Sequence, residues 1–188
     1  MHTSVVFRAA MVLLLAGIAS SCDSIKTRSD YAPNADFSNY RTFTWISDHP
    51  MIASTPMTNP LTDGRIQLAI INAMQAKGIS YVTEQKDANF VVAFMVGTRQ
   101  KVRVDTTNYP VGFRGPYAWG MGYVQDVDVR EFTEGQLAID IFDTRTRQPV
   151  WHGYGSKSVT DSDQKNAAEV IQKAVTAILK DFPPTPKS

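Results

Sequence analysis

The first pattern along the chain is an apolar run over residues 9–18, which directly follows Arg8. Small residues come after the run and end at Cys22. A basic residue, an apolar stretch of about 7–15 residues and a small-residue end are typical of a secretory signal peptide. The run is shorter than the ~20 apolar residues that a membrane-spanning helix needs. We therefore predict that residues 1–21 are a signal peptide that is removed on export.

Three segments of different composition lie between Cys22 and the first helical pattern. Residues 22–35 are largely polar and have no hydrophobic period, which predicts a short tether. Phe43 and Trp45 then alternate with threonines, so a first strand is expected within residues 36–46. Residues 47–60 hold three prolines and predict a loop.

A helix is predicted over residues 62–77, because apolar residues recur there at spacings of three and four and Gly78 follows as a stop. The recurring positions are Ile66, Ile70, Ala73 and Met74. Two strands are expected next, at residues 79–82 and 88–96, on either side of a polar turn. The second of these strands can run on as far as Val104.

The pattern then changes to strict alternation, with Val127 and Val129 placed between charged residues. Residues 133–135 have the composition of a turn, so a hairpin is predicted that returns through a strand at 136–143. A further strand is expected at residues 150–158, continuing the antiparallel order.

The last element is a predicted helix over residues 162–181. Asp161 with Gln164 three positions later resembles a capping box, and Pro183 with Pro184 ends the segment. One face of this helix is apolar. It consists of Ala168, Ile171, Val175, Ile178 and Phe182.

These elements predict a single α+β domain over residues 36–184, with residues 185–188 as a tail. We expect two layers, in which a mainly antiparallel sheet of five or six strands is packed by two helices. Trp45 and Trp151 are expected to face the helix layer. The chain is long enough to build such a core without disulfides.

Charge narrows the range of partners. Without Arg8 the chain carries 18 basic and 18 acidic residues. A balance of this kind argues against nucleic acid and against an anionic membrane surface as main partners.

Cys22 is the only cysteine of the chain, so a plain exported protein would keep a lone thiol in an oxidising compartment. The sequence Ala19-Ser20-Ser21-Cys22 resembles the lipobox of bacterial lipoproteins, in which the cysteine is acylated and becomes the first mature residue. The resemblance implies a protein held to a membrane by acyl chains on Cys22 and facing the periplasm. Asp23 resembles the inner-membrane retention signal of enteric bacteria, and the choice between the two membranes stays open.

Three further segments, at residues 36–45, 138–153 and 182–184, resemble the bacterial lipoproteins grouped as domain of unknown function 4136. They read Asp-Phe-Ser-Asn-Tyr-Arg-Thr-Phe-Thr-Trp, then Ala-Ile-Asp-Ile-Phe-Asp followed by Val-Trp-His-Gly, and finally Phe-Pro-Pro. The resemblance implies an envelope lipoprotein with a compact α+β domain. It supplies no activity and no catalytic residues.

Candidate chemistry is sparse. His49 and His152 share no metal-ligand spacing, so no metal site and no cofactor are predicted. Asp140 lies in an apolar strand and must be solvated or paired if it stays charged. It is a candidate general acid or base. The alternatives are a residue on the wetter sheet face, or one that is hydrogen-bonded by a neighbouring strand.

Residues 105–123 mix aromatic residues with glycine and proline, a composition that suits no regular element. The aromatic positions are Tyr109, Phe113, Tyr117, Trp119 and Tyr123. They are candidate partner-binding residues, because exposed aromatic side chains offer a large contact area. The alternative is that they cover the open face of the sheet.

We therefore expect a lipid-anchored protein of the bacterial cell envelope that is not an enzyme and acts as an accessory or interaction module, with a possible envelope protein partner. The alternative is a module that binds a lipid, glycan or peptide through residues 109–123. A deep apolar pocket would favour that alternative, and a cluster around Asp140 or His152 would favour an enzyme.

Overall fold

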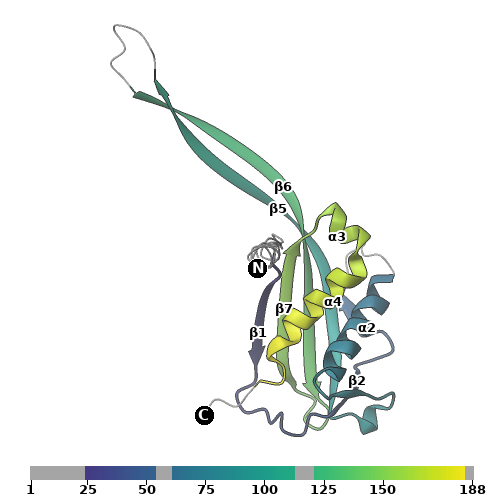
Figure 1. Ribbon diagram of the computed structural model, residues 1–188. Coiled ribbons are helices and arrows are strands. Elements are labelled where there is room, and N and C mark those ends of the chain that lie inside the picture. Colours follow the sequence, from purple (N-terminus) through teal and green to yellow (C-terminus); the bar gives the residue numbers. More distant parts are fainter. Residues whose placement is uncertain (1–23, 54–60, 113–120, 185–188) are drawn as a thin grey trace, which may run out of the picture.

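The computed structural model describes residues 24–53, 61–112 and 121–184 (Figure 1). The predicted signal peptide and Cys22 lie outside these residues. The strands are β1 (Lys26–Tyr31), β2 (Thr42–Trp45), β3 (Met51–Ala53), β4 (Ser80–Tyr81), β5 (Phe90–Gly112), β6 (Met121–Asp143) and β7 (Pro149–Ser158). The helices are α2 (Leu61–Gln75), α3 (Asp161–Lys165) and α4 (Ala167–Ile178), with short 3-10 turns η2 (Gln85–Asp87) and η3 (Leu179–Asp181).

The strands in these ranges form one mixed sheet in the order β1-β7-β6-β5-β2-β4, and β3 pairs with β5 beside that path. Pairing is antiparallel from β1 through β7 and β6 to β5, and parallel where β2, β3 and β4 join. The helices cover one face of the sheet (Figure 1). The predicted two-layer α+β fold is thus confirmed, with the short β3 added to a sheet of six strands.

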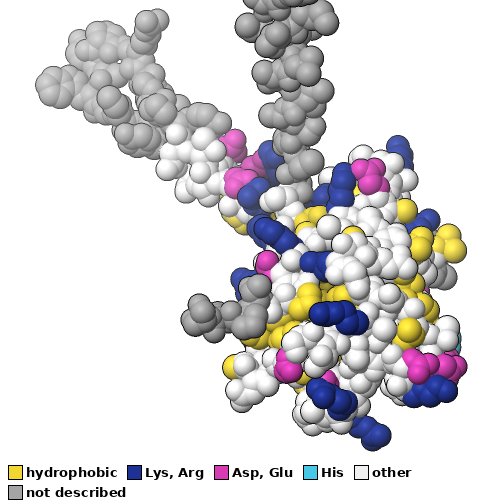
Figure 2. Space-filling view, turned by 60° about the horizontal axis from the view of Figure 1, so that its bottom comes forward, with side chains coloured by type: hydrophobic (Ala, Val, Ile, Leu, Met, Phe, Trp, Pro, Cys, Tyr) yellow, Lys and Arg dark blue, Asp and Glu magenta, His cyan; other side chains and the backbone are white. Residues whose placement is uncertain are grey.

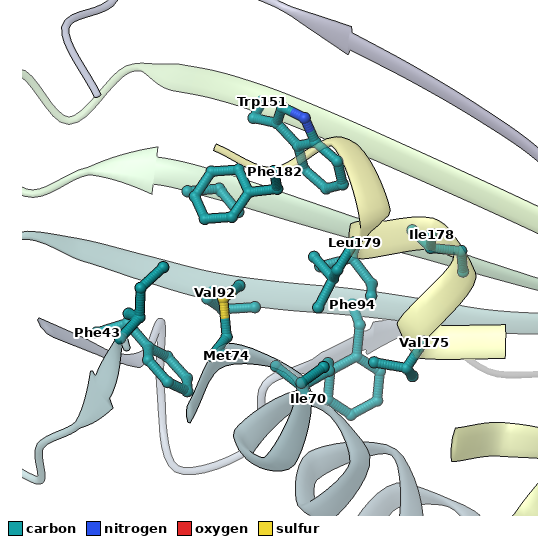
Figure 3. Packing of buried hydrophobic residues seen from close by; sticks show 14 of the residues in the cluster. Phe43, Ile70, Met74, Val92, Phe94, Trp151, Val175, Ile178, Leu179 and Phe182 are labelled. Carbon is teal, nitrogen blue, oxygen red and sulfur yellow. The ribbon is translucent and has the colours of Figure 1, made fainter. Parts of the chain in front are cut away.

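The core lies between the helices and the sheet (Figure 3). Ile70 and Met74 of α2 and Val175 of α4 are fully buried against the inner sheet face. Phe43, Phe90 and Tyr40 form a stacked series on that face, with ring centroids 5.8 and 4.8 Å apart. The apolar period predicted for the first helix therefore identified its buried face correctly.

Helix ends follow the local sequence. Gly78, in the turn that follows α2, has a φ of 77°, a conformation that glycine adopts without a steric penalty. The predicted final helix is divided at Asn166 into α3 and α4. Its N-cap is Thr160, which forms a capping box with Asp163, so the predicted pairing of Asp161 with Gln164 is wrong. The carboxylate of Asp163 accepts a hydrogen bond from the backbone N–H of Thr160, and the hydroxyl of Thr160 accepts one from the backbone N–H of Asp163.

The predicted tether at residues 22–35 is wrong for residues 26–31. Residues 26–31 form β1, which pairs antiparallel with β7 from Lys26↔Ser156 to Tyr31↔Trp151. This edge strand is held through its backbone, and five of its six side chains are exposed. Because its side chains face water, the sequence of β1 lacks the hydrophobic pattern by which a strand is usually recognised.

The predicted turn at residues 133–135 is also wrong, because β6 runs without a break from Met121 to Asp143. Gly135 lies in the middle of the strand, where an added Cβ would stand 3.0 Å from Val159 Cγ2. The absence of a side chain at Gly135 leaves space for Val159, which follows β7, and the strand continues through the glycine without a turn.

Candidate functional site

A two-stranded arm is the most unusual feature of the molecule. β7 ends beside Glu134, and β6 beyond that point pairs only with β5 in the described part of the chain. We call residues 99–112 and 121–134 the arm. It projects from the end of the sheet, clear of the helices (Figure 1). The prediction that residues 105–123 lack regular structure is therefore wrong for 105–112 and 121–123, which are strand.

One face of the arm carries a patch of four valines among polar residues. Residues that face each other across an antiparallel ladder lie on the same side of the sheet, so the pair Val104↔Val129 shares a face with Val102 and Val127. These four valines, the valine face, are between 52% and 60% exposed. Glu131, opposite Val102, lies on the same side near the base of the arm.

The valine face continues the inner face of the sheet. Counting in steps of two along β5 leads from Val102 back to Val96 and Phe94, and Phe94 lies in the core. This side of β5 is apolar beneath the helices and again at Val102 and Val104, with the polar Thr98 and Gln100 between the two parts. An isolated two-stranded ribbon is only marginally stable in water, so an exposed apolar side on such a ribbon indicates a contact surface.

The other face of the arm is charged. Arg103 lies opposite Arg130, and the next outward pair on that face is Asp105 opposite Asp128. Each arginine forms an ion pair with the aspartate two positions away on its own strand, at 3.7 Å for Arg103 to Asp105 and 2.5 Å for Arg130 to Asp128. Figure 2 shows basic and acidic side chains together where the arm leaves the domain. The arm is therefore amphipathic.

Glu134 fixes the base of the arm. Its carboxylate is buried and pairs with Lys101 and, at 3.5 Å, with Arg99, both from β5. Gln136 donates a further hydrogen bond of 3.1 Å. The hydrogen bond from Lys101 holds the pKa of Glu134 below its usual range. A buried carboxylate with this many partners joins the two strands where the third strand, β7, ends.

Two of the five aromatic residues predicted as a binding surface lie in the described part of the arm. Tyr109 lies in β5 and Tyr123 in β6, near the last described pairs of the ladder. Phe113, Tyr117 and Trp119 lie outside the described residues.

Asp140 and His152 are brought together by the pairing of β6 with β7. Their side chains meet at 2.7 Å between Oδ1 and Nδ1, on the sheet face opposite the helices. The neighbours in the same row are Ala93 of β5 and Asp30 of β1. Asp140 is thus hydrogen-bonded by a neighbouring strand, one of the two environments expected for it.

The remaining candidate groups do not converge within the described residues. His49 is exposed in the loop after β2. Within the described ranges, no three His, Cys, Asp or Glu side chains are grouped so as to hold a metal ion. A shallow depression of about 330 Å³ is lined by α4 and the adjoining η3, from Gln172 to Lys180, so it gathers side chains from one continuous stretch of the chain. None of the described helices is both long and apolar enough to cross a membrane.

Comparison with known proteins places the chain in a family. The model of the family described as Domain of unknown function (DUF4136) matches residues 27–184. The chain belongs to this family, as the sequence resemblance implied. The family match begins inside β1, in agreement with a domain that starts before residue 36.

Solved structures share the fold at low identity. A DUF4136 family protein from Bacteroides thetaiotaomicron superposes with a TM-score of 0.54 at 14% identity, covering 88% of this chain and 100% of that one. A PelC dodecamer from Paraburkholderia phytofirmans gives 0.50 at 12%, covering 83% and 96%. A PDZ domain protein from Parabacteroides distasonis gives 0.50 at 15%, covering 86% of this chain and 36% of that one. A search of curated proteins finds no match.

Sequence reasoning missed the valine face, although its signal is present. Val127 and Val129 alternate with charged residues, and Val102 and Val104 do the same. The sequence does not specify the register of β5 against β6, which places all four valines on one side of the arm. Val104 and its partner Val129 are 25 residues apart in the chain, so no local pattern links them.

Proposed function

We propose that this protein is a lipid-anchored module of the bacterial cell envelope that faces the periplasm and works through contacts rather than catalysis. The observation that carries the proposal is the arm, which places an exposed apolar face on a projecting element. A surface of that kind suits docking, whereas an enzyme needs a concave site with converging groups.

The anchor is supported by sequence. The apolar run at residues 9–18 and the single Cys22 give the arrangement of a lipoprotein precursor. The strand β1 begins at Lys26, so acyl chains on Cys22 would hold the domain close to the membrane. Two or more chains are needed for stable attachment, because one chain binds only marginally.

The anchor is tested by metabolic labelling with a palmitate analogue. The natural chain should take up label, and the Cys22→Ala variant should take up none and should leave the membrane fraction or accumulate as precursor. Label that survives this substitution would refute the anchor. Membrane fractionation of the natural chain and of Asp23→Ser then distinguishes the inner from the outer membrane.

The interaction role is tested by in-cell cross-linking of the anchored protein followed by affinity capture. A Val104→Ser, Val129→Ser variant should fold normally and lose its cross-links, because its apolar face is interrupted. A matched variant on the charged face, Thr107→Ala, should keep them. Equal capture by both variants would place the contact elsewhere.

A second candidate function is binding of a lipid, glycan or peptide at residues 109–123. The supporting observation is that Tyr109 and Tyr123 occupy the distal part of the arm, away from the helices and the core. Replacing Tyr117 and Trp119 by alanine should then leave the free energy of unfolding within about 0.5 kcal/mol of the natural chain and reduce ligand capture. A large loss of stability would instead support a covering role.

A further inference from the structure

The charged face of the arm, formed by Arg103, Asp105, Asp128 and Arg130, places like charges directly opposite each other. Arg103 of β5 faces Arg130 of β6, and in the next row outward Asp105 faces Asp128. Like charges directly opposite on neighbouring strands destabilise the pair. Exchanging one arginine with the aspartate beside it would give two rows of opposite charges from the same four residues. The order of charges on this face is therefore unfavourable for the ribbon by itself.

Each arginine has an aspartate beside it on its own strand. Arg103 pairs with Asp105 at 3.7 Å, and Arg130 pairs with Asp128 at 2.5 Å. Both hydrogen bonds from Arg130 end on one oxygen, Oδ2 of Asp128. The four side chains are between 47% and 71% exposed. A guanidinium has five N–H donors, so both arginines can bind a second carboxylate from outside the arm.

The charged face is complementary to itself when one copy is turned end for end. The arginine row lies two residues nearer the domain than the aspartate row, and the level midway between them is that of Val104 and Val129. Turning a second copy about this level sets each arginine row against an aspartate row. Arg103 then faces the second copy's Asp105, and the same holds in the other direction. A twofold contact uses one patch from both copies in this way.

The flanking rows keep the same order of charges. Lys101 lies in the next row towards the domain, and Asp126 in the next row towards the tip. In the reversed arrangement these two charges come to the same level, although Lys101 also pairs with Glu134 of its own chain. Parallel arms would instead place arginine rows against arginine rows. The pattern therefore favours one direction.

The helices leave the charged side of the arm open. Steps of two along β5 lead from Arg103 back to Ala93, on the sheet face opposite the helices (Figure 1). Gly112 and Val96 are each eight residues from Val104, so in the reversed arrangement the described end of one arm reaches the level of Val96 in the other copy. The arm of a second copy thus meets a sheet face that the helices do not cover.

We propose that the charged face binds the charged face of a second copy of this chain, with the two arms antiparallel. The inference goes beyond the proposed function, because this contact uses the side of the arm opposite the valine face. It joins the charged groups of both copies into one network in which opposite signs are adjacent. Single exposed ion pairs stabilise little, and a network stabilises more. Because the charges are exposed, salt weakens the contact.

The first test places a photo-reactive phenylalanine in the full chain at Thr107, on the charged face. The matched control carries it at Thr106, on the opposite face of the same strand. Cell extracts that retain their membranes are illuminated at about 0.01 M and about 1 M sodium chloride, between which the screening length falls from about 30 to 3 Å. We expect position 107 to give a cross-linked dimer at low salt, with a yield several-fold lower at high salt. Position 106 should give no dimer.

Mass spectrometry of the linked peptides determines the direction of the arms. Thr107 and Lys101 are each three residues from Val104, so antiparallel arms should link position 107 to peptides around the second copy's Lys101. A link to peptides around the second copy's position 107 would mean parallel arms and would overturn the proposal. Absence of a dimer at both salt concentrations, or equal dimer from positions 106 and 107, would also overturn it.

The second test inverts the charge pattern without changing the net charge. The inverted chain carries Arg103→Asp, Asp105→Arg, Asp128→Arg and Arg130→Asp, which keeps an ion pair along each strand. Thermal unfolding verifies that its domain is intact, and the first test does not depend on this variant.

Two tags on co-expressed copies, one of which carries the photo-reactive residue at position 107, measure which chains pair. Natural with natural and inverted with inverted should be captured together. The mixed pair should fall several-fold, towards background, because its rows then meet with like charges. Equal capture of the mixed pair, or capture of the natural pair alone, would refute the self-complementary pattern.

The outcomes are separate from those for the valine face. The Val104→Ser, Val129→Ser variant should lose the cross-links to its envelope partner and keep the dimer link from position 107. Loss of the dimer link in this variant would place the contact between copies on the valine face and overturn the inference. A natural chain that captures another protein but forms no dimer also refutes the inference, and leaves the proposed function standing.

Discussion

The hydroxyl of Tyr40 donates a hydrogen bond of 3.0 Å to Oδ2 of Asp143, although the two residues are 103 positions apart. The Asp143 carboxylate also accepts the backbone N–H groups of Arg145 and Thr146, at 3.0 and 2.8 Å. Burial by itself would raise the pKa of Asp143, but the hydrogen bonds from Thr146 and Tyr40 lower it below the usual range. Burial, together with the Asp143 contact, raises the pKa of Tyr40. This contact closes the end of the sheet opposite the arm.

Removing the Tyr40 hydroxyl should destabilise the fold. In Tyr40→Phe the ring still packs against Phe90, but a buried carboxylate loses one donor. Hydrogen bonds to charged groups contribute about 1.5–3 kcal/mol, so the free energy of unfolding should fall by about that amount in urea titration. The half-buried Tyr81 provides a control, since Tyr81→Phe removes a hydroxyl outside this network. Equal losses in both variants would contradict the role of Asp143.

Acid should weaken the protein through its paired carboxylates. The pKa values of Glu134, Asp143 and Asp163 are lowered in the folded state. A lowered folded pKa means that the unfolded chain binds protons first as the pH falls. The stabilisation is therefore complete above the ordinary carboxyl pKa, about 4, and is lost as the pH drops through the folded values.

The measurement is the urea midpoint at a series of pH values from neutral to strongly acidic. We expect a fall that begins near the ordinary carboxyl range and continues below it. In Tyr40→Phe the acid-dependent part should be smaller, because Asp143 then has a folded pKa closer to that of the unfolded chain. An identical pH profile in the variant would show that Tyr40 does not affect the ionisation of Asp143.

Substitution by alanine should change the stability in opposite directions at two glycine positions. A Cβ at Gly153 would stand 2.1 Å from Cη2 of Trp151 and 2.7 Å from Cγ2 of Ile178, so Gly153→Ala should cost about 1–3 kcal/mol by overpacking. Gly64 lies within α2 with nothing within 4 Å of an added Cβ. Gly64→Ala should stabilise the helix by about 0.5–1 kcal/mol. Thermal or urea unfolding of the pair tests the close approach of α4 to β7, and a neutral Gly153→Ala would refute it.

The two tryptophans should differ in their contribution to stability. Trp151 is 2% exposed and packs on Phe182 with ring centroids 5.3 Å apart, whereas Trp45 is half-buried beside Tyr81 and Phe94. Trp151→Ala should cost about 3–5 kcal/mol and Trp45→Ala clearly less. Urea midpoints measure both, with the exposed Leu68→Ala as a control near zero. A larger loss at Trp45 would reverse the assignment of the core.

Sequence patterns located the elements whose neighbours are close in the chain or whose sides differ in polarity. The period of Ile66, Ile70 and Met74 identified α2 and its buried face. The strand predicted at residues 136–143 likewise lies within β6, where Leu137, Ile139 and Ile141 alternate and are buried on the inner face.

Elements that depend on distant partners were not predictable from local patterns. β1 is polar and exists because β7, more than a hundred residues later, offers its edge. The residues at 133–135 have turn composition, yet Glu134 is held in a straight strand by Lys101 and Arg99 from the neighbouring strand. The Asp140–His152 contact likewise depends on the register of β6 against β7. In each case the deciding contact is set by pairing rather than by composition.

The two strands of the arm are also two inner strands of the sheet, between β7 and β2. No loop or hinge separates the projecting part from the core, because β5 and β6 each continue through both. A pull on the arm would load these strands lengthwise, so that several ladder hydrogen bonds to β7 and β2 would have to shear together. Force applied at the distal end of the arm would therefore be transmitted along β5 and β6 to the core residues that the helices cover.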